Sequence, residues 1–107
     1  MPNYLIQLAY TPEAWAAMIK NPQDRIAAVR PLIEGLGGTI DAGYLSFGEY
    51  DLVAIAEFPD NVTAASFSVA STAGGAFKAF KTTPLLTIAE AQDAMKKASS
   101  IKYQPPK

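Results

Sequence analysis

Apolar residues recur along the chain with two spacings, one typical of strands and one typical of helices. Short runs rich in aromatic and aliphatic residues predict strands over residues 4–10, 39–47, 50–58 and 76–86. Helical spacing and capping residues predict a short helix that begins at Pro12 and longer helices over residues 22–36, 61–73 and 87–98. The pattern therefore indicates a chain that contains both strands and helices.

The apolar residues of two helices predict which side of each helix faces the core. In the helix over residues 22–36, Pro31 is expected to cause a kink, and the expected inward stripe is Ile26, Val29, Leu32, Ile33 and Leu36. In the helix over residues 61–73, Phe67 is expected to lie off the inward stripe, which is predicted to be Val62, Ala65, Val69 and Ala73. Both helices end at paired glycines, which favour a left-handed cap.

The element order β-α-β-β-α-β, followed by a C-terminal helix, is that of a ferredoxin-like α+β fold with one four-stranded antiparallel sheet. Pro84 indicates that the last strand lies at an edge or contains a bulge. Two helices can cover only one face of the sheet, although residues 39–58 carry apolar side chains on both faces. We therefore expect two copies to pack their sheets together as a dimeric α/β barrel. We expect a single domain over residues 1–107, with a loose tail at 98–107.

Composition removes several classes of activity. The chain has neither cysteine nor histidine, which excludes thiol nucleophiles, disulfides, Cys/His zinc sites and imidazole bases. A formal net charge of −1 and the lack of a long apolar run predict no nucleic-acid partner and no membrane partner. No signal peptide is recognised, so a cytoplasmic location is expected. Charged residues make up 18% of the chain, below the ~25% of an average soluble domain, which favours a homodimer or higher homo-oligomer.

One hairpin segment resembles the signature of a known family. Residues 43–53 read GYLSFGEYDLV, which is similar to the Gly…Tyr-Asp element of the GYD-domain family, and the resemblance covers about residues 2–91. Supporting matches are Tyr4, Thr11-Pro12-Glu13, Arg25, Gly37-Gly38 and Pro59-Asp60-Asn61. The resemblance implies a stress-responsive branch of the dimeric α/β-barrel superfamily, similar to the effector-binding domain of Lrp/AsnC-type regulators.

The same hairpin supplies the first candidates for chemistry. Asp51 is a weak candidate for a catalytic base or a ligand anchor, and the interpretation that we favour is a carboxylate that caps the turn. Tyr44 and Tyr50 suit a half-apolar ligand pocket or, more commonly, a subunit interface. Glu49 is expected to be solvated, with contact to a ligand as the alternative. Two carboxylates without a supporting cluster predict no metal site.

Arg25 is the candidate partner for a ligand carboxylate, because a guanidinium matches a carboxylate with two parallel hydrogen bonds. The alternative is that Arg25 and Arg30 form ion pairs with Asp24, Glu34 or a partner subunit. With no activated nucleophile and no cofactor predicted, we expect a small-ligand-binding or assembly module. The alternative is a cofactor-independent enzyme, of isomerase or monooxygenase type, that acts on a small hydrophobic or aromatic molecule.

Overall fold

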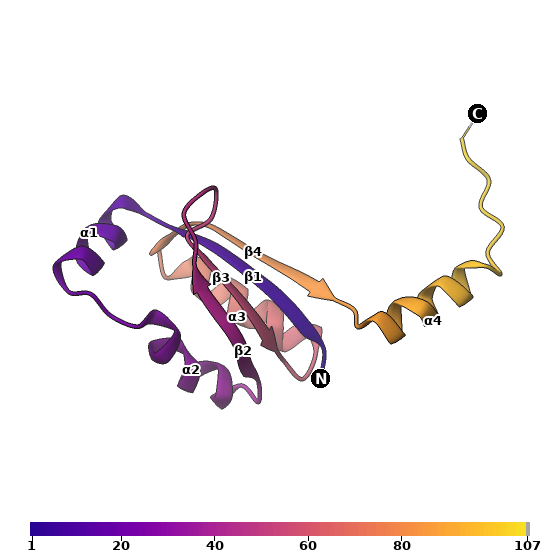
Figure 1. Cartoon of the computed structure of the whole chain (residues 1–107), viewed down its shortest axis with the longest axis horizontal. Coiled ribbons are helices and arrows are strands. Elements are labelled where there is room, and N and C mark those ends of the chain that lie inside the picture. The colour runs from indigo at the N-terminus through magenta and orange to yellow at the C-terminus, as the bar shows by residue number, and fades with distance from the viewer. Residues whose placement is uncertain (107) are drawn as a thin grey trace.

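A computed structural model describes residues 1–106 and confirms the α+β, ferredoxin-like arrangement (Figure 1). Within these residues, four antiparallel strands form one sheet in the order β2-β3-β1-β4. In chain order the elements are β1 (Asn3–Tyr10), α1 (Pro12–Lys20), α2 (Arg25–Gly35), β2 (Thr39–Leu45), β3 (Leu52–Glu57), α3 (Asn61–Ala73), β4 (Phe77–Leu85) and α4 (Ile88–Ala98). The strand that contains Pro84 lies at a sheet edge, as predicted.

Side-chain caps determine where the helices begin. The capping side chains accept a hydrogen bond from the backbone N–H three residues later and are Thr11, Asp24, Asp60 and Thr87. Because Asp24 is the cap of α2, this helix starts at Arg25, and the predicted start at Pro22 is wrong. The helix continues through Pro31 without interruption and is followed by Gly37, whose φ is 83°.

The hairpin between β2 and β3 has shorter strands than the sequence predicts. β2 ends at Leu45 and β3 begins at Leu52, whereas the expected strands reach residue 47 and start at residue 50. The backbone N–H of Ser46 donates to the Asp51 carbonyl at 2.7 Å, and the Ser46 hydroxyl donates to the Tyr50 carbonyl at 2.7 Å. These bonds close residues 46–51 into a loop at the tip of the hairpin.

The core lies between one face of the sheet and the helices α2 and α3. The strand side chains buried on this face are Tyr4, Ile6, Leu8, Tyr10, Ile40, Leu52, Ala54 and Ala56. On α2, Ile33 is buried as predicted, but Leu32 of the same predicted stripe is 55% exposed. The Arg30 guanidinium donates to the Ile40 carbonyl at 3.0 Å and so ties α2 to β2.

The side of α3 that faces the core is opposite to the side that the sequence predicts. Phe67 is buried, whereas Val62 and Val69 of the predicted inward stripe are 76% and 69% exposed. The Phe67 ring packs against Phe58 and Phe80, with ring centroids at 5.7 and 6.0 Å. The prediction is wrong because the ring fills space that valine and alanine side chains would leave as a cavity.

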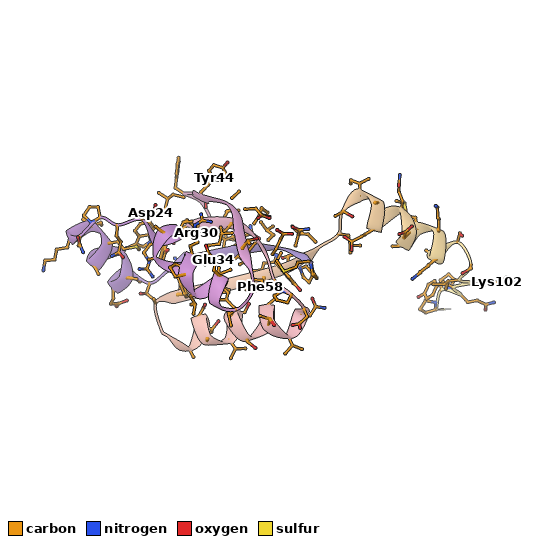
Figure 2. The ribbon with its side chains drawn as sticks, turned by 90° about the horizontal axis from the view of Figure 1, so that it is seen from below. Asp24, Arg30, Glu34, Tyr44, Phe58 and Lys102 are labelled. Atoms are coloured by element: carbon orange, nitrogen blue, oxygen red, sulfur yellow. The ribbon has the colours of Figure 1, made fainter. Side chains whose placement is uncertain are left out.

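The second face of the sheet has no helix over it within residues 1–106. This face carries the half-buried residues Leu5, Val53 and Ile55 beside the polar residues Gln7 and Lys81. Tyr44 projects from the side of the sheet away from α3 (Figure 2). The helix α4 continues the course of β4 away from the sheet and does not cover this face (Figure 1).

Candidate functional site

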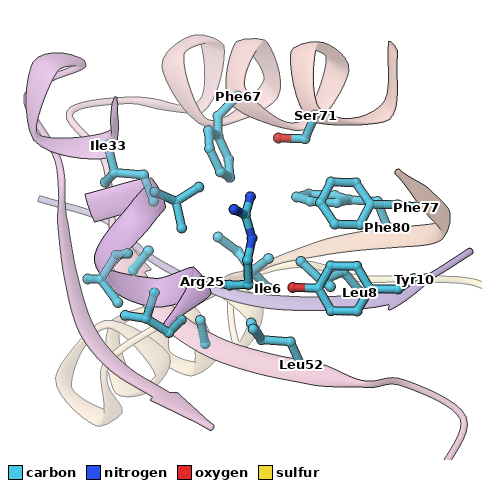
Figure 3. Close-up of a pocket in the computed structure, with 15 residues that line it drawn as sticks. Ile6, Leu8, Tyr10, Arg25, Ile33, Leu52, Phe67, Ser71, Phe77 and Phe80 are labelled. Carbon is cyan, nitrogen blue, oxygen red and sulfur yellow. The ribbon is translucent and has the colours of Figure 1, made fainter. Parts of the chain in front are cut away.

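An apolar cavity of about 50 Å³ lies between the sheet and the helices α2 and α3 (Figure 3). Side chains of β1 and β3 form its floor, side chains of α2 and α3 form its walls, and Phe77 and Phe80 of β4 close one end. Most of its lining is hydrocarbon, so the cavity favours the apolar part of a ligand.

A continuous row of aromatic rings supports this cavity. Ring centroids are 5.3 Å apart for Trp15 and Tyr10, and 5.4 Å apart for Tyr10 and Phe77. The row continues to Phe80 at 5.4 Å and then to Phe67 at 6.0 Å. These separations, with tilted or edge-on ring planes, are typical of favourable aromatic pairs. The rings belong to α1, β1, β4 and α3, so the row ties four elements together around the cavity.

The polar side chains that line the cavity are Tyr10, Arg25 and Ser71. Arg25 extends from the start of α2 toward Phe67, and the Ser71 hydroxyl points into the same space (Figure 3). Burial raises the pKa of the Tyr10 phenol, and the nearby positive charge of Arg25 opposes this shift. The Arg25 guanidinium donates to the side-chain carbonyl of Gln23 at 2.9 Å. Since that partner is neutral, this bond does not offset the positive charge of Arg25.

A wider cleft of about 420 Å³ adjoins the cavity. It lies between β2 and the segment that joins α1 to α2, and Trp15 and Met18 of α1 line one side. The residues that line both spaces are Tyr10, Arg25, Ile26 and Leu52. Arg25 therefore lies at the junction of the two spaces, where it can meet a charged group whose apolar body rests against the walls.

Asp51 holds together the end of β1 and the start of α1. One carboxylate oxygen, Oδ2, accepts hydrogen bonds from the backbone N–H of Tyr10 at 2.9 Å and from the indole N–H of Trp15 at 3.2 Å. The backbone N–H of Asp51 also donates to the Leu8 carbonyl at 2.8 Å. Asp51 lines neither the cavity nor the cleft. Its carboxylate positions two of the residues that do.

The remaining site residues predicted from sequence fall in two different places. Tyr44 borders the wider cleft together with Arg25, although the tyrosine side chain is 72% exposed. Glu49 and Tyr50 lie in the hairpin loop and line a shallow depression with Lys81, on the uncovered side of the sheet. The structure thus brings Arg25 and Tyr44 to one cleft and places Glu49 and Tyr50 at another surface.

Sequence reasoning missed most of the cavity lining. Phe77 and Phe80 are three residues apart on a strand, a spacing that normally puts two side chains on opposite faces. A register shift between Ala9 and Tyr10 changes this, since Tyr10 pairs with Phe77 and Leu8 pairs with Phe80. Both rings therefore reach the cavity, and no residue in the sequence signals the irregularity.

No cluster of three metal-ligating side chains occurs within residues 1–106. In the same part of the chain, no helix has the length and apolarity needed to cross a membrane. The family described as GYD domain matches residues 4–95, a range that includes the cavity, the cleft and the hairpin loop. No curated protein and no solved structure matches the chain.

Proposed function

The chain belongs to the GYD-domain family, and we propose that it is a non-enzymatic protein that binds a small amphipathic anion. The ligand has an apolar body, aromatic or branched, and one carboxylate or equivalent anionic group. Its binding site is the wider cleft together with the adjoining cavity. The observation that carries the proposal is the position of Arg25, a cationic side chain that lines both spaces.

The sizes of the two spaces suggest how such a ligand lies. An apolar cavity of about 150 Å³ binds benzene, so the inner cavity, at about 50 Å³, takes only a smaller apolar group. The wider cleft of about 420 Å³ has room for a ring. We place the ligand body in the cleft, against Trp15 and Met18, with a short apolar substituent directed into the cavity. The anionic group then meets Arg25 at the junction.

The chemistry of this junction favours a carboxylate over a neutral group. A guanidinium presents donors in a planar fork that matches a carboxylate, and such charge-assisted bonds are stronger than neutral ones. The hydrocarbon around Arg25 lowers the local dielectric, which strengthens the attraction further. The neutral phenol of Tyr10, whose pKa is raised by burial, offers one additional hydrogen-bond donor.

Thermal stabilisation by a matched panel of ligands tests this proposal. Benzoate, phenylacetate and a branched aliphatic carboxylate are compared with the corresponding neutral amides by the shift that each causes in Tm. A ligand at ten times its Kd stabilises the fold by about 1.4 kcal/mol, which raises Tm by roughly 5 °C or more for a domain of this size. Equal shifts for the acids and the amides would remove the role of the charge.

Two variants separate Arg25 from general charge effects. Arg25→Gln should abolish the Tm shift caused by the carboxylates, because the charged contact is lost. Lys20→Gln removes the same charge from the end of α1, outside the residues that line the cleft, and should keep the shift. Binding that survives in Arg25→Gln, measured also by the fluorescence of Trp15, the single tryptophan, would refute the site.

We also propose that the chain assembles as a homodimer through the uncovered face of the sheet. Leu5, Val53 and Ile55 leave part of their apolar surface exposed on this face, and 18% charged residues is a low content for a monomer. Light scattering should give at least twice the chain mass at micromolar concentration, and Val53→Lys should lower that mass. A wild-type monomer under these conditions would contradict the assembly.

The catalytic alternative has weaker support. Its base would be Asp51, whose Oδ2 already accepts two hydrogen bonds and which lines neither the cavity nor the cleft. A general base must lie within hydrogen-bond reach of the proton that it removes. Asp51 does not meet this requirement for a ligand held at Arg25, so we favour binding without chemistry.

A further inference from the structure

The outward side of α3 has an unusual composition for an exposed surface. No residue of Asn61–Ala73 is charged, although an exposed helix normally carries charged residues on its outer face. The stripe that points away from the core is Val62, Ala65, Val69 and Ala73. These small apolar residues recur every three or four positions, which is the spacing of a helix face that packs against another helix. The stripe therefore has the properties of a covered surface.

A groove runs beside this stripe, between α3 and the edge strand β4. Its volume is about 370 Å³, and it is bordered by Ala65, Val69, Phe80, Thr82 and Pro84. The hydroxyls of Ser68 and Thr82 bond to each other across it at 2.6 Å, so they present no unpaired polar group to an apolar occupant. Small side chains on α3 allow the backbone of a second helix to approach closely.

The helix α4 carries a matching surface that no other element within residues 1–106 buries. Its apolar stripe, Ile88, Ala91, Met95 and Ala98, follows the same three- and four-residue spacing. A capping box at Thr87 and Glu90 starts the helix, yet none of its residues is buried. An isolated helix of this length is marginal in water. Packing against another surface would therefore be needed to keep it helical.

We propose that α4 of one copy docks on the outward stripe of α3, in the α3–β4 groove, of a second copy. In Figures 1 and 2, α4 runs on from the end of β4 and away from the body of its own chain. Only Leu86 and Thr87 separate it from β4, which holds it on this outward course. A second copy supplies the α3 stripe that α4 reaches. Because α3 carries no charged residue, docking does not remove a charged side chain of α3 from water.

The apolar area of this arm is adequate for a stable contact. The arm is α4 together with residues 99–106, and the exposed fractions of its large apolar residues Ile88, Met95, Ile101 and Tyr103 lie between 63% and 78%. Covering them removes roughly 300 Å² of surface for each arm, at roughly 100 Å² for a whole aliphatic and 150 Å² for a whole tyrosine side chain. Two arms and the equal areas that they cover give about 1,200 Å², the lower limit for a stable protein pair.

Cross-linking between two full-length variants tests the exchange. The chain has no cysteine, so Val69→Cys and Met95→Cys each introduce a single thiol. The two variants are mixed, equilibrated and oxidised, and the mixed disulfide is identified by mass. Ala89→Cys, about 120° around α4 from Met95, is the matched control. We expect at least a fivefold excess of the Val69–Met95 mixed product over the Val69–Ala89 product.

The same cysteines distinguish exchange from two other arrangements. The double variant should form disulfides between copies; a disulfide within one chain means that α4 folds back on its own α3 and overturns the proposal. Predominant Met95–Met95 disulfides mean that two arms pair with each other, which also overturns it.

A measurement without cysteine protects the test against misfolded variants. In the wild-type chain, hydrogen-exchange protection of residues 88–98 should rise at least fivefold between nanomolar and high micromolar concentration. Met95→Glu should remove that rise, whereas Ala89→Glu, which adds the same charge outside the apolar stripe and about 120° around α4 from Met95, should keep it. Protection that does not depend on concentration would show that α4 has no partner copy.

Discussion

Replacing Asp51 with alanine should lower the free energy of unfolding by about 2–4 kcal/mol. Its Oδ2 accepts the backbone N–H of Tyr10 and the indole N–H of Trp15. A hydrogen bond to a charged group contributes about 1.5–3 kcal/mol, and we discount the sum because the two bonds share one oxygen and Asp51 is half-exposed. Alanine also leaves the N–H of the buried Tyr10 without its acceptor, a cost that a surface substitution does not have.

A short series of variants divides this loss between the two bonds. Asp51→Asn keeps a carbonyl oxygen without the charge and should cost about 1–2 kcal/mol. Trp15→Phe removes only the indole donor and keeps a ring beside Tyr10, and it should cost about 1 kcal/mol. In the double variant the two losses should fall short of additivity by about 1 kcal/mol, which is the coupling through the shared bond. Urea denaturation followed by far-ultraviolet circular dichroism suits all of these variants, because it does not require the tryptophan.

Glu49→Ala is the control, since this exposed carboxylate lies in the same loop and should change stability by less than about 0.5 kcal/mol. A loss of the same small size in Asp51→Ala would refute the anchoring role. Full additivity of the two substitutions would show that the Asp51–Trp15 bond does not contribute. The first of these results would reopen Asp51 as a residue with a free carboxylate.

Three further predictions concern packing and pH. A Cβ on Gly38 would lie 2.4 Å from the Glu57 carbonyl oxygen, so Gly38→Ala should lower the unfolding free energy by about 1–3 kcal/mol in urea; an unchanged value would contradict this close approach. Phe67→Ala should cost about 3–5 kcal/mol, and a loss below about 1 kcal/mol would place the ring outside the core. A backbone N–H of α3 lowers the pKa of Asp60 below its ordinary value of 3.8, so the stability from this cap is present above that pH and is lost as the pH falls through the lower folded value. The decline of Tm on acidification should therefore be shallower in Asp60→Asn, which cannot ionise, and an identical decline would refute the contribution.

Local signals in the sequence account for the fold because they act over a few residues. A Thr or Asp followed by helical spacing identifies each helix start, and the bond that it forms spans only three residues. The start of α2 was predicted three residues too early because Pro22 and Asp24 both signal a helix start, and the side chain of Asp24 provides the cap. Pro84 indicated an edge strand because proline lacks the backbone N–H that a central strand needs for pairing. Each of these inferences needs no knowledge of distant residues.

The candidate site depends on contacts that sequence periodicity does not encode. On α3, periodicity groups the valines into one stripe, but the sheet beneath the helix already presents Phe58 and Phe80, and Phe67 packs between them. The bulge opposite Phe77 likewise follows from the pairing of β1 with β4. Arg25 could be singled out because a rare arginine in an apolar chain is conspicuous. The rings around it could not.

The hairpin motif of residues 43–53 mainly positions other residues of the cleft and contributes little to the lining of the cavity. A Cβ on Gly43 would lie 2.6 Å from Cδ1 of Ile26, so the missing side chain lets α2 pack closely on β2 and holds the adjacent Arg25 at the junction of the two spaces. At the other end of the motif, Asp51 fixes Trp15 on the facing wall through its indole N–H. A substitution at Gly43 should therefore weaken ligand binding by displacing Arg25. A substitution at Asp51 should displace Trp15, and the size of the ligand that is accepted should then change before the preference for an anion does.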